Sequence, residues 1–259
     1  MRYNIKKLKS IPKELKDINN PPKSLFYVGD SSLLKMPKVS IVGTRRPNSY
    51  TKDFTFSLAK ALSDIGVCVV SGGAMGVDAI AHRGAFPNTI SILANSLDFF
   101  YPAVNQKLLS KLYENSLAIS EYEKDYKARP YSFVLRNRLV VGLGDVLIVT
   151  EADENSGSLR SVEFAIKQGK KVFVLPQRLG ESKGTNKLLA EKKAEPIYDI
   201  STFISLFTTN IKPALKDEKE EFFSTNPSLD EALQKYGSKI YELELEGKII
   251  IKNLKVYLS

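Results

Sequence analysis

The stretch Val67-Cys-Val-Val-Ser-Gly-Gly-Ala-Met-Gly-Val-Asp-Ala-Ile-Ala-His82 decides the fold class of this chain. Its first four residues form a short apolar run, which is typical of a strand buried on both faces of a sheet. Paired glycines follow this run, and a stretch with helical spacing follows the glycines. A strand that passes through a glycine turn into a helix is the repeating unit of a parallel sheet covered by helices.

The same alternation of apolar runs and amphipathic stretches continues on both sides of this segment. It predicts an α/β fold with an extended Rossmann-like, mainly parallel sheet, helices on both faces and right-handed crossovers. Strands are expected at 25–28, 39–42, 67–70, 89–94, 117–120, 145–150 and 171–175. Helices are expected at about 50–65 and near 75–84, 105–113, 134–142, 158–168 and 185–192.

The chain of 259 residues is long enough for one sizeable core and a small appendage. Residues 1–38, rich in Lys and Pro, are expected to form a lead-in packed on the main domain, which spans residues 39–211. The charged residues 212–221 are typical of a solvated linker. Residues 222–259 combine helical stretches with a strand pair after Gly247, which suggests a small winged-helix-like domain.

The net charge of +9 is not evenly distributed. Lys and Arg number nine against three Asp and Glu in residues 1–38, 21 against 17 in residues 39–211, and eight against nine in residues 212–259. The positive excess favours a nucleic-acid partner for the first two segments rather than the last. No apolar run approaches the ~18–20 residues of a membrane span, and the single Cys68 cannot form an internal disulfide. We therefore expect a cytoplasmic protein without a membrane partner.

Parallel sheets bind ligands outside the carboxyl ends of their strands. After the strand at 39–42 come Gly43, Thr44, Arg45 and Arg46. The glycine permits a tight turn, the next helix points free N–H groups at it, and the threonine and arginines add donors for a phosphate. The alternative is a solvated turn with two surface arginines.

After the strand at 67–70, Gly72, Gly73 and Ala74 can form a backbone anion nest. No Gly-Lys-Ser/Thr follows, and no acidic residue ends the strand at 89–94, so neither a P-loop nor a redox cofactor is expected. We predict no cofactor for this chain.

Three polar residues of the following helix have different expected roles. Asp78 either orients the glycine loop or contacts the ligand. His82, the only histidine, is expected to be structural because no nucleophile accompanies it, and Arg83 is expected to face the groove. No paired Cys or His pattern supports a metal, and no residue is expected to be catalytic.

The segment Arg129-Pro-Tyr-Ser-Phe-Val-Leu-Arg-Asn-Arg138 is the densest group of candidates. Phe133 or Tyr131 offers a ring on which an unpaired base can stack. The alternative places Phe133 in the core and the arginines in internal ion pairs. The candidates for phosphate contact are Arg129, Arg136, Asn137 and Arg138.

After the strand at 145–150, Ser156, Gly157 and Ser158 form a third anion site at a helix start. Glu151 and Glu154 would oppose a phosphate there unless they orient arginines or face away. They also leave open an enzyme of the nucleotide phosphoribohydrolase type, although a Gly-Gly-Gly-Thr turn is missing. A third alternative is an adaptor that binds only proteins.

Taken in order, these motifs resemble the DprA/Smf family (DNA processing protein A). The resemblance rests on Ser40–Pro47, Ser71–His82, Tyr101-Pro102, Ile119–Glu121, Phe133–Arg138, Glu151–Ser158 and Gly184–Asn186. Compared with the family, an N-terminal helical domain is expected to be missing, Thr44 replaces a usual serine, and Val134 replaces a usual proline.

The resemblance implies a single-stranded DNA-binding protein of natural transformation rather than an enzyme. Such a protein protects incoming DNA, helps to load a RecA-type recombinase and forms a homodimer. Ile200, Phe203, Ile204 and Phe207 form one helical stripe, which we expect at the dimer interface; the alternative is that it packs on the edge of the sheet.

Overall fold

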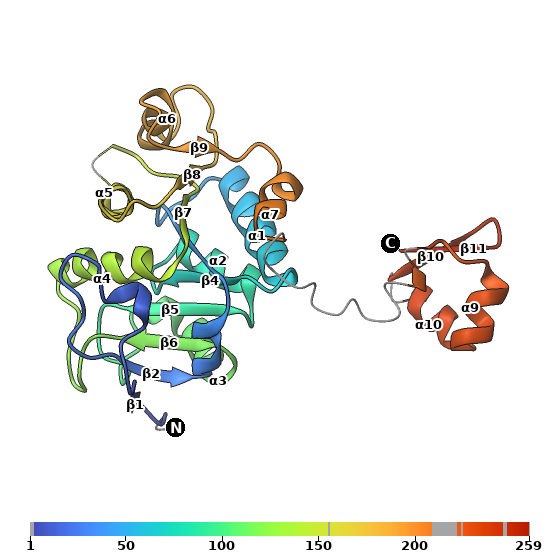
Figure 1. Ribbon diagram of the computed structural model, residues 1–259, viewed down its shortest axis with the longest axis horizontal. Coiled ribbons are helices and arrows are strands. Elements are labelled where there is room, and N and C mark those ends of the chain that lie inside the picture. The colour runs from blue at the N-terminus through green and yellow to red at the C-terminus, as the bar shows by residue number, and fades with distance from the viewer. Residues whose placement is uncertain (1–2, 155, 209–221, 224, 246–247, 259) are drawn as a thin grey trace. The chain divides into compact units, whose positions relative to one another are not determined.

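The chain divides into two compact units, residues 1–211 and residues 212–259, which are described separately. The first unit is built around one large sheet, and the α/β class predicted from the sequence is confirmed (Figure 1). The structure, a computed structural model, describes residues 3–154, 156–208, 222–223, 225–245 and 248–258.

Within these residues the sheet of the first unit has the order β1-β2-β6-β5-β4-β3-β7-β8-β9. The strands from β6 to β9 are parallel, and β2 and β1 add an antiparallel edge. The strands are β1 (Lys6–Lys7), β2 (Phe26–Gly29), β3 (Lys38–Val42), β4 (Cys68–Gly72), β5 (Thr89–Leu93), β6 (Leu117–Ser120), β7 (Val146–Val149), β8 (Val172–Val174) and β9 (Glu195–Pro196).

The helices alternate with these strands as the sequence predicts. Only α4 starts clearly earlier than expected, because proline suits the first turn of a helix and the Ser132 hydroxyl accepts the Arg129 N–H at 3.2 Å. The helices are α1 (Ser49–Asp64), α2 (Val77–Ala85), α3 (Gln106–Asn115), α4 (Pro130–Leu143), α5 (Gly157–Lys167), α6 (Lys183–Ala190) and α7 (Ile200–Thr208).

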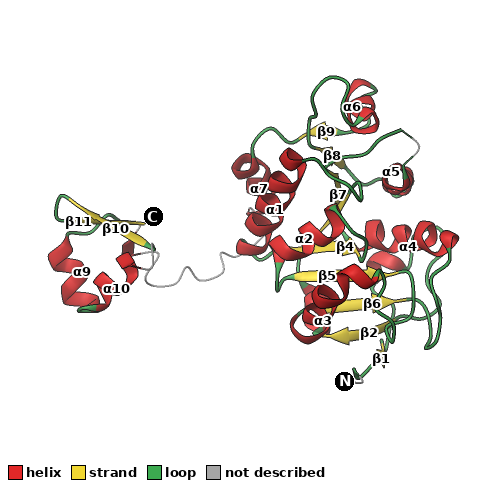
Figure 2. Ribbon diagram, turned by 180° about the vertical axis from the view of Figure 1, so that it is seen from behind, coloured by secondary structure: helices red, strands yellow, loops and turns green. Residues whose placement is uncertain are grey.

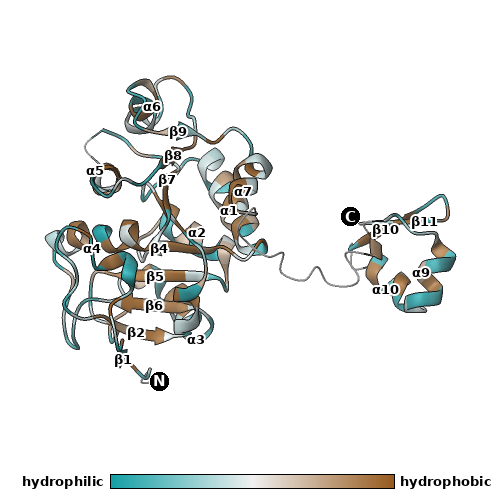
Figure 3. Cartoon of the chain, in the orientation of Figure 1, coloured by the Kyte–Doolittle hydropathy of each residue, from teal (hydrophilic) through white to brown (hydrophobic). Residues whose placement is uncertain are grey.

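The central strands are buried on both faces. Ile41 packs with α1 and α2, whereas its neighbour Val42 packs with α4 and α5. Helices α1, α2 and α3 thus cover one face of the sheet (Figure 2), and α4 and α5 cover the other. The strands β4 and β5 are accordingly mostly brown in Figure 3.

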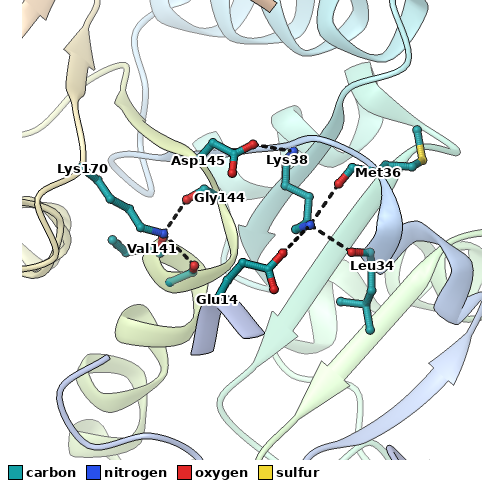
Figure 4. A network of polar contacts seen from close by, with 9 residues as sticks. Glu14, Leu34, Met36, Lys38, Val141, Gly144, Asp145 and Lys170 are labelled. Carbon is teal, nitrogen blue, oxygen red and sulfur yellow. Dashed lines mark hydrogen bonds and ion pairs between the residues drawn. The ribbon is translucent and has the colours of Figure 1, made fainter. Parts of the chain in front are cut away.

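The buried Lys38 at the start of β3 fastens the lead-in to the sheet, and the partly buried Lys170 holds the end of α4 nearby (Figure 4). Lys38 Nζ lies 3.0 Å from Glu14 Oε1 and donates to the carbonyls of Leu34 and Met36, while its own side chain is only 5% exposed. Lys170 donates to three carbonyls at the end of α4, and burial lowers the pKa of this lysine to about 8. These bonds fix the carboxyl end of α4, the helix that lines the cavity described below.

The second unit contains α9 (Leu229–Tyr236), α10 (Lys239–Leu245) and a hairpin of β10 (Ile249–Lys252) with β11 (Lys255–Leu258). Its core includes Ala232, Ile240 and Val256. The helices and the hairpin match the sequence-based expectation, while the winged-helix assignment stays a prediction and the predicted linker at 212–221 lies outside the described residues. None of the helices described in either unit is long and apolar enough to cross a membrane.

Candidate nucleic-acid interface

The order in which the strands are added to the sheet changes direction at β3. Strands β4, β5 and β6 follow on one side of β3, and β7, β8 and β9 follow on the other. Parallel sheets bind ligands at such a switch point, outside the carboxyl ends of the strands. A cavity of about 600 Å³ opens there. Its lining includes Gly43, Thr44, Arg45, Gly72, Ala74, Asp78, Pro130, Phe133, Val134, Arg136, Asn137, Ser156, Gly157, Ser158 and Ser161.

The turn after β3 is held between two neighbouring elements. The Thr44 N–H donates to the Glu151 carbonyl at 2.8 Å, and the Val77 N–H donates to the Thr44 carbonyl at 3.1 Å. The exposed Arg45 side chain therefore extends from a backbone that is held in place. Its guanidinium lies 5.7 Å from the centre of the Phe133 ring. An arginine on a fixed turn at a cavity rim is well placed to bind a phosphate.

The floor of the cavity holds a buried pair of opposite charges. Arg136 is 6% exposed and donates to the Ile92 carbonyl, and the Asp78 carboxylate accepts the Ala74 N–H at 3.3 Å. Burial raises the pKa of Asp78, and the nearby Arg136 opposes that rise. Gly72 makes room for both groups, since a Cβ at this position would overlap the guanidinium and the carboxylate.

One stripe of α4 forms a wall of the cavity. Phe133, Val134 and Asn137 lie at helical spacing along it. Phe133 is half-buried, and the centre of its ring lies 5.7 Å from the Arg45 guanidinium and 5.7 Å from the centre of the Tyr101 ring. Because part of this ring faces solvent at the cavity, the structure does not support the alternative that Phe133 is a core residue.

The start of α5 closes the cavity on the β7 side. Ser156, Gly157 and Ser158 all line it, and the first N–H groups of a helix have no partner within the helix. The hydroxyls of Ser156 and Ser161 are buried and have no hydrogen-bond partner within the described part of the chain. A buried hydroxyl without a partner is uncommon, and both of these lie at the wall of the cavity.

Several predicted site residues do not line the cavity. Arg138 is 3% exposed and pairs with Glu121 at 2.6 Å, which is the internal ion pair that the sequence left as an alternative. Successive residues of a helix point about 100° apart, so α4 cannot turn Arg136, Asn137 and Arg138 to one side. The others outside the lining are Arg46, Gly73, Arg83 and Arg129.

His82 has the structural role that the sequence predicts. Its Nε2 lies 2.7 Å from the Gly72 carbonyl and therefore carries the proton, while its Nδ1 lies 2.7 Å from the Thr89 hydroxyl. Burial lowers the pKa of this imidazole to about 4. The histidine thus supports the backbone of the cavity floor in its neutral form.

Glu151 and Glu154, which follow β7, are engaged by other partners than the cavity residues. The Glu151 carboxylate accepts the Asn48 N–H at 3.1 Å, and Glu154 lies 3.8 Å from Lys187. Neither residue is among those that line the cavity. Asp78 is the one carboxylate among the described lining residues.

The apolar stripe on α7 covers the core of its own unit. Phe203 is 5% exposed and meets the Phe173 ring of β8 at 5.0 Å, and Ile200, Ile204 and Phe207 pack against the same cluster. The stripe thus packs at the edge of the sheet, which is the alternative that the sequence left open, while its assignment to a dimer interface stays a prediction. Its spacing could not distinguish an inward face from an unpartnered one.

Two site features were missed in the sequence. Ser161 lines the cavity one helical turn after Gly157, a spacing that could have revealed it. Tyr101 contacts Phe133 from a loop that is distant in sequence, and no local pattern indicates this contact.

Comparison with known proteins gives consistent matches. The family model for DNA recombination-mediator protein A matches residues 3–208. DNA processing protein DprA of Bacillus subtilis is 36% identical over 175 residues, which cover 66% of this chain and 59% of that protein. The Streptococcus pneumoniae DprA is 36% identical over 187 residues, which cover 70% and 65%. The chain therefore matches about six tenths of the length of these relatives.

Two solved structures share the fold at clear sequence identity. DNA processing protein A from Helicobacter pylori, for which a unique single-stranded DNA binding mode is described, aligns with a TM-score of 0.79 and 47% identity. This alignment covers 81% of the present chain and 98% of that one. The Streptococcus pneumoniae DprA structure aligns with a TM-score of 0.72 and 30% identity, covering 79% and 74%.

Proposed function

Because this chain belongs to the DNA recombination-mediator protein A family, we propose that it binds single-stranded DNA in the cavity at the ends of β3, β4 and β7. The observation that supports this most directly is the contact of Arg45 with Phe133, 5.7 Å apart at the rim. It places a phosphate-binding cation beside a ring on which a base can stack. The single-stranded DNA binding described for the Helicobacter pylori protein supports the same assignment.

The cavity offers separate positions for the phosphate and for the base of one nucleotide. Arg45, the Thr44 hydroxyl and the N-terminus of α5 supply donors for a phosphate. The half-exposed face of Phe133 receives the base, and the partnerless hydroxyls of Ser156 and Ser161 take up polar atoms of the same nucleotide. In a duplex the base faces are covered by their neighbours, so an aromatic wall favours an unpaired strand.

The finer role that we propose is recombination mediation in natural transformation. The protein protects incoming single strands and helps to load a RecA-type recombinase onto them, and it acts as a homodimer. Membership of a recombination-mediator family supports mediation. Strand exchange by a RecA-type protein, measured with and without this chain, tests the loading. Mass determination by light scattering tests the dimer, and a mass near 28.9 kDa would contradict it.

The decisive experiment compares Arg45→Ala with Arg83→Ala in fluorescence anisotropy with a labelled oligothymidylate. Arg83 is exposed but lies outside the cavity, so it is a matched control for removal of one positive charge. Arg45→Ala should weaken binding and flatten the log–log salt dependence by about 0.7 for each phosphate that is no longer neutralised. Equal affinities of the two variants would contradict the proposal.

A second variant tests the aromatic wall. Phe133→Ala should weaken binding by about 1–3 kcal/mol without a change in salt slope, because stacking releases no counterions. Equally tight binding of duplex DNA by the parent protein would argue against this wall. Release of a free base from a nucleotide by the pure protein would instead support the phosphoribohydrolase alternative.

A further inference from the structure

A second exposed aromatic side chain lies directly beside the proposed stacking residue. Tyr101 is 51% exposed, and its ring centre lies 5.7 Å from that of Phe133, with 45° between the two ring planes. Tyr101 does not line the cavity itself. The two rings therefore form a bent ledge that begins at the cavity wall and continues outside it.

The ledge lies beside the strand that comes next in the sheet after the strands of the cavity. Ser158 follows β7, Arg45 follows β3 and Gly72 follows β4, and these three strands are neighbours in the sheet. Tyr101 follows β5, the next strand in the same direction. Neighbouring strands are about 4.8 Å apart, so each loop in this series lies one short step further along the same edge of the sheet.

The loop that holds Tyr101 buries its first part and exposes apolar side chains in its second part, since Leu97 is 2% exposed and Tyr101 51%. Val104, three residues later, is 70% exposed. Lys127 Nζ lies 5.9 Å from the centre of the Phe99 ring and so places a positive charge beside the same loop. An exposed ring, an exposed aliphatic side chain and a nearby cation match the mixture found along single-strand binding grooves.

We propose that Tyr101 stacks the base of the nucleotide next to the one held by Phe133, so that the strand leaves the cavity over β5 toward β6. This inference rests on the proposed function and adds a second nucleotide subsite and a direction to it. Two bases stacked on rings inclined by 45° cannot be parallel to each other. The ledge therefore requires a strand whose successive bases are separated, which neither a duplex nor a stacked single helix provides.

The test measures the affinity of the full chain for oligothymidylates from about 4 to about 16 nucleotides, the range covered by one single-strand binding fold. For the longer oligonucleotides, Tyr101→Ala should weaken binding about 5- to 150-fold, with an unchanged salt slope. The effect should be small for the shortest ones, which the cavity alone can hold. Tyr198→Ala is the matched control, because Tyr198 is 85% exposed and follows β9, at the other end of the sheet order.

A second readout does not depend on removing the ring. The chain has 12 tyrosines and no tryptophan, so its ultraviolet emission comes from tyrosine. A bound base should quench Tyr101, and Tyr101→Phe should bind as tightly as the parent while losing that part of the quenching. Tyr198→Phe should keep it.

The outcomes separate the two proposals. No binding of single strands by the parent overturns the proposed function and this inference together. Parental affinity of Tyr101→Ala at every length overturns the second subsite alone. An equal weakening for short and long oligonucleotides also overturns it, because Tyr101 would then act only by holding Phe133 in place.

Discussion

Replacing Gly76 with alanine should displace the turn that we propose to bind phosphate, without changing any side chain of the proposed DNA site. Gly76 has φ 77° and ψ −129°, a conformation that side chains rarely allow. A Cβ at this position would lie 2.6 Å from both the carbonyl carbon and the Cα of Arg45, and closer still to the Thr44 oxygen. Ordinary contact begins at 3.4 Å, so the Arg45 backbone must move by about 1 Å.

The expected magnitudes follow from this displacement. The backbone conformation alone should cost about 1–3 kcal/mol of folding free energy. The shift should also move Arg45 away from Phe133, so that Gly76→Ala loses DNA affinity and flattens the salt slope as Arg45→Ala does. Gly169→Ala is the control, since Gly169 also has a positive φ of 65° but its Cβ would meet nothing within 4 Å.

The assay combines salt-titrated anisotropy with chemical denaturation of both variants. Gly169→Ala should lose stability and keep the affinity of the parent, whereas Gly76→Ala should lose both. If Gly76→Ala remains folded and binds with the parental affinity and salt slope, the turn either does not move or does not anchor the phosphate. This result would refute the role assigned to the close approach of Gly76 and Arg45, whichever of the two explanations holds.

Three further variants test the assignments inside the core. Arg138→Met should cost about 3 kcal/mol in denaturation, because it leaves the partly buried Glu121 unpaired, and it should leave DNA affinity unchanged. The free energy of unfolding should fall by about 2 kcal/mol between pH 7 and pH 5. The reason is that the His82 imidazole has a pKa near 6.5 in the unfolded chain and a pKa of about 4 in the folded protein. His82→Gln should lose this part of the pH dependence. Phe203→Ala should cost about 3–5 kcal/mol at unchanged molecular mass, whereas the same change at the 57% exposed Leu206 should cost under about 0.5 kcal/mol.

The main sheet could be predicted because burial on both faces leaves an unmistakable pattern. Each central strand is an apolar run bounded by a turn. The run at 39–42 lies within β3, and the run at 117–120 coincides with β6. Strands β1 and β9 were missed because each has two residues, too few for any periodicity to show. The family resemblance drawn from the ordered motifs is also confirmed.

The site could be predicted loop by loop but not side chain by side chain. Turns after strands must meet at one edge of a parallel sheet, which correctly places Arg45, Gly72 and Ser158 together. The rotation of α4 about its axis depends on tertiary packing, so the sequence could not tell that Arg136 faces the cavity and Arg138 faces Glu121. The same limit applies to the α7 stripe, whose inward direction depends on Phe173 of a distant strand.

The distribution of charge in the cavity supports the proposal that it binds a DNA strand rather than a free nucleotide. At the floor, Asp78 and Arg136 offset each other, whereas at the rim Arg45 is exposed and its neighbour Phe133 is neutral. A free nucleotide with several phosphate charges would gain little from a floor that contains a carboxylate. A strand can place its single phosphate charge at the rim and its neutral base against Phe133 and the hydroxyls below. In the proposed binding mode the next phosphate leaves along the edge of the sheet, so the arrangement that holds one nucleotide would direct its neighbour toward Tyr101.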